Sequence, residues 1–249
     1  MLVSIVQAII PSLDYTSALA VVVLAIVLLA MVAFKALQQG GVVSPSSGNT
    51  VLIVGPMGSG KTALFYRLVL GEGSKLPKTV TSQAPNAEEF SPCEEKSSKK
   101  LQLVDLPGHD SQWPAAMERT SDAAGIIFLM DSSKPQTTVA GQKLFDLLCD
   151  PGLKKRKIPF LVACNKSEEE GAKSLDDIQD DLHADLQDRT EFKDTIEDTE
   201  GNTIVKKMTE DDESDFKFEE LPCPIKFTTV SLKKGDIAPI EKFCQELLR

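Results

Sequence analysis

The sequence predicts an α/β domain, in which a mostly parallel β-sheet carries helices on both faces, preceded by a single membrane-spanning helix. Five short apolar segments have the length of buried strands, and they lie at residues 51–54, 101–104, 125–130, 158–164 and 225–230. Helical patterns separate most of them, including one at residues 139–148, and a last one covers residues 237–247. Buried strands that alternate with helices are typical of such sheets. Residues 88–94 can add one antiparallel edge strand.

The membrane-spanning helix is expected from residues 15–34, which contain no charged residue and consist mainly of Val, Leu, Ile and Ala. At about 1.5 Å per residue, a helix of this length spans about 30 Å, the thickness of the hydrocarbon layer of a bilayer. A buried helix of a soluble protein would show a polar face, which this segment lacks. A cleaved signal peptide would begin with basic residues, whereas the only charged side chain before the run is Asp14.

The charges that flank this run predict its orientation and the division of the chain. Lys35 follows the run and Asp14 precedes it, which favours a lumenal N-terminus and a cytosolic remainder. The linker that follows is rich in Gly, Ser and Pro, and the length after it suits one domain. We therefore expect a short lumenal N-terminus at residues 1–14 and a transmembrane signal anchor at residues 15–37. A linker at residues 38–48 would then lead into a cytosolic domain at residues 49–249.

The first apolar strand of this domain leads directly into a complete phosphate-binding loop. The loop consists of Gly55, Pro56, Met57, Gly58, Ser59, Gly60, Lys61 and Thr62. A helical pattern begins at Ala63, which we also expect to contact the nucleotide. Its glycines let backbone N–H groups point at phosphate oxygens, its lysine adds a positive charge, and its threonine offers a hydroxyl to Mg²⁺. The N-terminus of the following helix also favours phosphate. The sequence therefore predicts a site for a nucleoside triphosphate and Mg²⁺.

Two later motifs predict which nucleotide binds. Asp105 and Gly108 belong to a DLPG sequence after the second strand, where we expect the carboxylate to hold the Mg²⁺ shell and the glycine N–H to reach the γ-phosphate. Asn165, Lys166 and Glu168 are similar to the Asn-Lys-x-Asp motif with which GTPases bind guanine. The amide and the carboxylate would bond the base edges while the lysine stem packs on the ring. The order of motifs predicts a P-loop small-GTPase fold that binds GTP.

The loop after the last strand completes the expected base site. Ser231 and Leu232 stand where GTPases support the base through backbone groups, although those proteins usually have Ala in place of Leu232. Glu168 is a second departure, because the usual residue is Asp, one methylene shorter. A longer carboxylate can still accept hydrogen bonds from guanine.

Taken together, these residues resemble the β subunits of the signal recognition particle receptor, which are membrane-anchored relatives of Ras and Arf GTPases. The resemblance covers nearly the whole chain and rests on the apolar span, the P-loop, and residues 105–109, 163–166 and 215–222. It implies a GTP-bound anchor on the endoplasmic reticulum membrane that recruits the receptor α subunit, and through it ribosomes and the translocon. Arf or Sar coat GTPases are the nearest alternative, but they carry an amphipathic N-terminal helix.

The resemblance also implies roles for residues near the γ-phosphate. Thr81, or as a second choice Thr79, would meet Mg²⁺ from the first switch loop. His109 is the candidate catalytic residue, because it stands where many GTPases use Gln to orient the attacking water. Met57 is bulky where Ras-like proteins usually have Gly, so we expect slow intrinsic hydrolysis. Trp113, the only tryptophan, is either an interface anchor or a core residue.

Charge and composition narrow the alternatives. Residues 168–220 form an acidic insert with 21 Asp or Glu and 6 Lys or Arg, which is typical of a solvated surface or a disordered loop and less often of a docking surface for a basic partner. The net charge of −10 disfavours direct nucleic-acid binding. Five scattered cysteines indicate reduced, mostly buried thiols. A P-loop kinase would need clustered arginines, which the sequence lacks.

Overall fold

The computed structural model describes residue 23 and residues 48–71, 84–92, 100–191, 195–197, 203–205, 208 and 216–248. The chain divides into two compact units, residues 1–46 and residues 47–249. Within the first unit only Val23 is described, and it is helical. The predicted span at residues 15–37 otherwise lies outside the described residues, as do Thr79 and Thr81. Among the residues that are described, no helix is long and apolar enough to cross a bilayer.

The second unit is built on a six-stranded sheet with the strand order β2-β3-β1-β4-β5-β8. The strands are β1 (Thr50–Val54), β2 (Asn86–Phe90), β3 (Leu101–Asp105), β4 (Ala123–Asp131), β5 (Phe160–Asn165) and β8 (Ile225–Thr229). Every neighbouring pair is parallel except β2 and β3. The five predicted strands are therefore present, and the carboxyl ends of β1, β3, β4 and β5 meet at one edge of the sheet.

The antiparallel edge strand exists, but it lies at residues 86–90 instead of the predicted 88–94. Asn86 pairs with Asp105 and Phe90 with Leu101, so the ladder ends at the buried Phe90. Pro92 follows two residues later and has no backbone N–H to donate to a ladder. The exposed Glu88 and Glu89 lie in the middle of the strand, as expected at a sheet edge.

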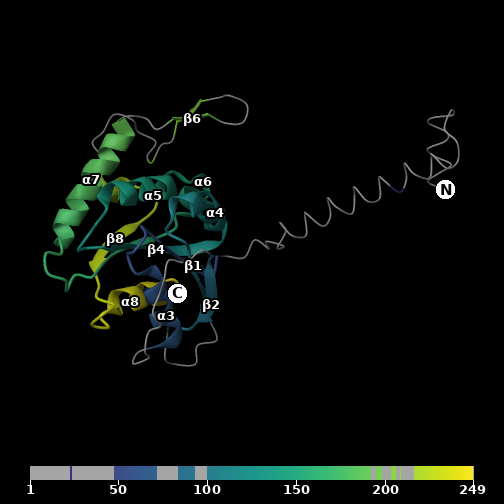
Figure 1. Cartoon of the computed structure of the whole chain (residues 1–249). Helices are drawn as coiled ribbons and strands as arrows, with labels where there is room; N and C mark the ends of the chain where they lie inside the picture. The colour runs from purple at the N-terminus through teal and green to yellow at the C-terminus, as the bar shows by residue number, and fades with distance from the viewer. Residues whose placement is uncertain are drawn as a thin grey trace. The chain divides into compact units, whose positions relative to one another are not determined.

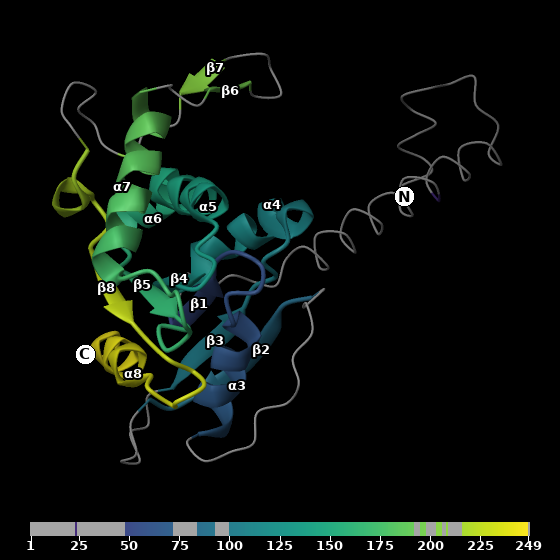
Figure 2. The ribbon, with the colours of Figure 1, turned by 60° about the vertical axis from the view of Figure 1, so that its left-hand side comes forward.

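Helices cover both faces of this sheet (Figures 1 and 2). One face carries α3 (Lys61–Leu70) and α8 (Ala238–Glu246), and the other carries α4 (Trp113–Met117), α5 (Thr137–Cys149), α6 (Pro151–Arg156) and α7 (Leu175–Glu191). Successive side chains of a strand point to opposite faces. In β1, accordingly, Val51 and Ile53 pack in the core under α3 and α8, and Leu52 and Val54 in the core under α5.

The acidic insert contains the longest helix among the described residues. α7 buries Ile178, Leu182 and Leu186, which are spaced by four residues and pack in the core beside α5. Its aspartates point mainly to solvent, so the expectation of a solvated surface fits this part of the insert and that of a disordered loop does not. A stripe of three apolar residues is enough to dock a helix that is otherwise charged. Beyond it, β6 (Thr195–Glu197) and β7 (Thr203–Val205) form a separate antiparallel pair.

Short 3₁₀ turns complete the fold at Asp110–Gln112, Glu118–Asp122 and Phe218–Glu220. Four cysteines lie among the described residues, and all four are free thiols. Three of them are buried, as the sequence predicts. Burial raises the pKa of the Cys164 thiol to about 12, so this group stays protonated.

Candidate functional site

The phosphate-binding loop connects β1 to α3 at the carboxyl edge of the sheet. Gly55 has a φ of 138°, and a Cβ there would lie 2.1 Å from the backbone oxygen of Leu129 in the neighbouring β4. Only glycine fits this position, because L residues avoid such a φ and the backbone of β4 leaves no room. The loop is thus packed against the sheet at its start, and Lys61 begins α3 at its end.

Lys61 lies across the loop, where its Nζ donates to the Pro56 carbonyl at 2.8 Å. The residue is only 7% exposed. Burial lowers the pKa of Lys61 to about 8, although the charge of Asp105 partly offsets this effect, and Lys143 lowers the pKa further. The acceptor that the described residues offer to this buried ammonium is a neutral carbonyl, so the site is well suited to an anionic ligand, which would supply a negative charge.

The two described residues predicted to serve Mg²⁺ contact each other directly. Thr62 Oγ1 donates to Asp105 Oδ2 at 2.7 Å, and Asp105 is fully buried. A buried carboxylate beside a threonine hydroxyl is an oxygen-donor set of the kind that Mg²⁺ prefers. Asn86, which sequence reasoning missed, also donates to Asp105 Oδ2 at 3.2 Å. Asn86 reaches Asp105 because the antiparallel pairing of β2 with β3 places the two residues opposite each other, and only the structure shows this pairing.

Asn165 joins three loops at the other end of the site. Its Nδ2 donates to the Ser59 carbonyl in the phosphate-binding loop at 2.9 Å, and its Oδ1 accepts from the Leu232 N–H at 3.2 Å. The residue is 3% exposed. The structure therefore brings Ser59, Asn165 and Leu232, which the sequence places far apart, into one hydrogen-bonded unit.

Lys166 extends this unit toward the tip of the phosphate-binding loop. It adopts a left-handed backbone conformation with a φ of 62°, and its Nζ donates to the Gly58 carbonyl at 3.0 Å. It also forms an ion pair with Asp131, the last residue of β4, which sequence reasoning missed. Burial alone would raise the pKa of Asp131, but hydrogen bonds from Lys166 and Ser133 lower it below its ordinary value.

An open pocket of about 380 Å³ lies beside Asn165. Nine residues line it: Gly58, Gly60, Ala63, Asn165, Lys166, Glu168, Glu169, Leu232 and Lys233. Seven of them are predicted nucleotide-binding residues. Glu169 and Lys233 are additions, and they form an ion pair of 3.0 Å between two loops that line the pocket.

Glu168 keeps an ionised carboxylate at this pocket. Partial burial would raise its pKa, but a hydrogen bond from Ser231 and the charges of Lys233 and Lys234 lower it below its ordinary value. Among the residues that the structure describes, none supplies a hydrogen-bond donor to the buried Oε2 atom of Glu168. Ser231 thus lies beside Glu168, and the Leu232 N–H is bonded to Asn165.

At the phosphate end, the DLPG segment packs against the phosphate-binding loop. A Cβ at Gly108 would lie 2.5 Å from Lys61 Nζ and 3.0 Å from the Met57 N atom, so a larger residue would force the lysine side chain and the loop to shift. His109 is exposed, and its Nδ1 accepts from the Ser111 N–H at 3.2 Å. Met57 is 48% exposed at the loop tip, where Gln136 donates to its carbonyl at 3.2 Å.

Comparisons with known proteins identify the family and the fold of the chain. The family model described as signal recognition particle receptor beta subunit matches residues 46–225. The human signal recognition particle receptor subunit beta is 30% identical over 94% of this chain and 88% of its own length.

Solved structures show the same fold. A structure of the mammalian receptor is 28% identical, covers 80% of this chain and 99% of its own, and has a TM-score of 0.68. A complex of SRb-GTP with SRX from Chaetomium thermophilum is 23% identical, covers 80% and 97%, and has a TM-score of 0.59, which shows the fold alone. The chain belongs to the family of signal recognition particle receptor β subunits and has its mixed α/β small-GTPase fold.

Proposed function

We propose that this chain binds GTP with Mg²⁺ at residues 55–63, 105–108, 165–168 and 231–232. The observation that carries the proposal is the Glu168 carboxylate, which is ionised beside an open pocket and has a buried oxygen with no described donor. Guanine presents two N–H groups on one edge, which a carboxylate can accept, whereas adenine presents no such pair. Asn165 holds the pocket's loops in place through Ser59 and Leu232.

The phosphates would lie on the backbone of the loop between Gly55 and Thr62, at the N-terminus of α3, with Lys61 beside them. Thr62 and Asp105 would hold Mg²⁺, together with Thr81 or Thr79 from the segment outside the described residues. When bound, Mg²⁺ neutralises part of the charge on the β- and γ-phosphates. The approach of Gly108 to Lys61 and Met57 would place its N–H at the terminal phosphate.

We further propose that the domain serves as the GTP-dependent receptor subunit that recruits the α subunit to the endoplasmic reticulum. Residues 15–37 would anchor the chain, with residues 1–14 in the lumen and the GTPase domain, residues 49–249, in the cytosol beyond the linker, residues 38–48. The family membership supports this role, and the uncharged apolar run supports the anchor. Alkaline carbonate extraction tests the anchor, because a spanning chain stays with the membrane and an amphipathic one is released.

Hydrolysis is proposed to be slow and to depend on His109. In the structure this side chain caps its own 3₁₀ turn through Ser111, so it would have to turn away from Ser111 to orient a water. Met57, which is exposed at the loop tip, would further crowd the γ-phosphate and the attacking water. Single-turnover measurements would show a slow rate, and a rate equal to that of a fully activated GTPase would contradict the proposal.

The experiment that tests GTP binding is a titration of the full-length chain in detergent with GTP, GDP and ATP in the presence of Mg²⁺. We expect strong GTP binding, negligible ATP binding, and loss of the guanine preference in Glu168→Ala. Glu168→Asp is the matched control, because it keeps the carboxylate and should keep the preference. Equal affinities for GTP and ATP in the unaltered chain would overturn the proposal.

A further inference from the structure

The end of α6 carries four basic residues in succession, Lys154, Lys155, Arg156 and Lys157. The first three lie in the last turn of the helix, and Lys157 ends it with a left-handed φ of 52° just before β5. Lys155, Arg156 and Lys157 are exposed. Basic residues in a last turn stabilise a helix through its dipole. That effect does not account for the concentration of this basic run, residues 154–157, at one point of a chain whose net charge is −10.

Hydrogen bonds hold the basic run at the amino edge of the sheet. Arg156 Nη1 donates to the carbonyl of Ala123, the first residue of β4, at 2.7 Å, and Nη2 donates to the Thr120 carbonyl at 2.6 Å. Both acceptors are neutral, so these bonds position the guanidinium without cancelling its charge. The other end of β4 is Asp131, which pairs with Lys166 at the proposed nucleotide site. The basic run is therefore separated from that site by the length of β4, about 25 Å.

The chain enters the domain at the same point. A Cβ at Gly48 would lie 2.7 Å from the carbonyl oxygen of Ala123, the atom that accepts from Arg156. The backbone at Gly48 therefore lies beside the basic run, although the two are far apart in the sequence. Residues 38–48 connect this point to the predicted span, and even fully extended they reach at most about 40 Å. In an anchored chain, the amino edge of the sheet would thus stay close to the membrane surface.

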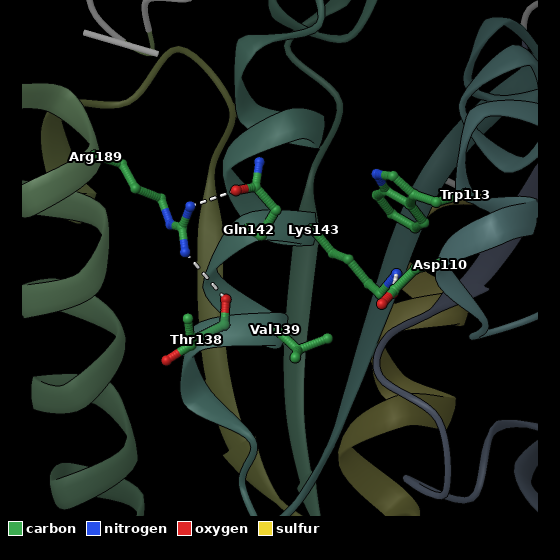
Figure 3. A pocket seen from close by; sticks show the side chains of 7 residues that line it. All are labelled: Asp110, Trp113, Thr138, Val139, Gln142, Lys143 and Arg189. Atoms are coloured by element: carbon green, nitrogen blue, oxygen red, sulfur yellow. Dashed lines mark hydrogen bonds and ion pairs between the residues drawn. The ribbon is translucent and has the colours of Figure 1, made fainter. Parts of the chain in front are cut away.

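The basic run also differs from other basic residues in its partners. Several lysines of the domain form ion pairs: Lys100 with Glu89, Lys143 with Asp110 (Figure 3), Lys166 with Asp131 and Lys226 with Glu246. Within the described part of the chain, Lys155 and Lys157 have no such partner. The acids that adjoin the run are Glu118 and Asp122 of the neighbouring 3₁₀ turn, and Asp150, whose carboxylate caps α6. They do not cancel its charge, so an exposed positive surface remains.

We propose that the basic run binds anionic phospholipid headgroups of the membrane in which the chain is anchored. The inference rests on the proposed anchor, and it adds a second membrane contact, its residues and the class of lipid. Each Lys or Arg near an anionic bilayer strengthens association by about fivefold, and attachment of the chain raises the local lipid concentration further. Because the nucleotide site lies at the other end of β4, this contact would turn that site away from the bilayer and toward the cytosol.

The test measures the reactivity of individual lysines in the full-length chain, inserted in lipid nanodiscs and treated with an amine-reactive reagent before mass spectrometry. The discs contain phosphatidylcholine alone or with about 30% phosphatidylinositol, which adds negative charge to the surface. We expect Lys155 and Lys157 to react about threefold or more slowly in the anionic discs, and raised salt to remove the difference. Lys134, which is exposed beyond the carboxyl end of β4, is the internal control and should react equally in both discs.

Two variants with the same change of charge separate the basic run from the rest of the surface. Lys155→Glu places a negative charge in the run, so the protection of Lys157 in anionic discs should fall to less than about half. Lys134→Glu makes the same change at the opposite edge of the sheet and should leave the protection of Lys157 unaltered. Both positions are exposed, so each variant should fold normally, and urea unfolding checks this.

The outcomes separate this inference from the proposed anchor. If alkaline carbonate releases the chain from the membrane, the anchor fails, and the inference with it. If the chain is retained, yet Lys155 and Lys157 react equally in neutral and anionic discs, the anchor stands and the inference is overturned. Protection that appears only after RNA is added would make a nucleic acid the partner of the basic run, which also overturns the inference. So would protection of Lys157 that persists in Lys155→Glu, because charge would then not be the cause.

Discussion

The base end and the switch end of the proposed nucleotide site are held together by different contacts. At the base end, the buried Asn165 bonds two backbone groups in two other loops. At the switch end, His109 bonds within its own turn, and the mostly exposed Asp110 pairs with the buried Lys143. Breaking buried bonds to the backbone is costly, whereas exposed contacts exchange with water at little cost.

This difference separates the contacts that would recognise the base from those that would respond to the γ-phosphate. The base pocket is formed by the folded chain itself, so a guanine would enter a site that needs little rearrangement. If Asp110 moved with the segment after Gly108, the buried Lys143 would lose or exchange its charged partner. That pair therefore adds a cost that the exposed His109 contact does not, and the following variants test each end separately.

The largest effect is expected from Asn165→Ala at the base end. It removes both bonds and leaves the buried Leu232 N–H and Ser59 carbonyl without this partner. We expect the free energy of unfolding to fall by about 2–3 kcal/mol and GTP affinity to fall more than about 100-fold. Urea unfolding and nucleotide titration measure the two quantities. Asn165→Asp, which keeps only the acceptor, should be intermediate, and an Ala variant with unaltered affinity would contradict a preformed base end.

A smaller effect is expected from Asp110→Asn at the switch end. Lys143 would keep its buried charge but lose its ionic partner, which should lower the free energy of unfolding by about 1–2 kcal/mol, because one partner is exposed. GDP affinity should stay unchanged, since the base end is intact. The double variant Asp110→Asn, Lys143→Met should recover stability, and Glu118→Gln, at another exposed acid, is the control. A loss of GDP affinity in Asp110→Asn would show that the two ends are not separate.

Asp131→Asn tests the ion pair behind the base pocket through its pH dependence. The pKa of Asp131 is lower in the folded chain, so its stabilisation is present above the ordinary pKa of an aspartate and is lost as the pH falls through the folded value. We expect unaltered and variant chains to differ by about 1 kcal/mol at pH 7, and the difference to shrink below about pH 4. Urea titrations at several pH values measure it. A difference that is constant with pH would mean that the Lys166 pair contributes nothing.

The sequence predicts the base end far better than the contacts around it. Strands, the helices α3, α5 and α8, and the motif residues follow from local spacing and residue type, and the structure places Asn165, Lys166, Glu168, Ser231 and Leu232 at or beside one pocket. The helix α7 was not predicted, because its three buried apolar residues are hidden among aspartates.

The sequence does not predict several hydrogen-bond and ion-pair partners of the site residues, because these contacts depend on how the strands and helices pack in the folded domain. Asn86 reaches Asp105 only through the antiparallel pairing of β2 and β3. Asp131 meets Lys166 because β4 and β5 end side by side, with Asp131 opposite Asn165. In the sequence, Lys143 is one polar residue in the pattern of an amphipathic helix. Its burial beside Asp110 depends on where the turn at Asp110 lies in the folded domain.

The smallest effect is expected from Glu169→Gln, which removes the ion pair with Lys233 beside the base pocket. Both residues are exposed and their ion pair is screened by solvent, so the free energy of unfolding should hardly change. The GTP dissociation rate, measured by stopped flow, should change less than about twofold, with Lys233→Gln as the reciprocal variant. Glu169 lies at the same end of the site as Asn165, but Glu169 is exposed and Asn165 is buried. A large effect would mean that position beside the nucleotide, and not burial, decides which contacts hold the base end.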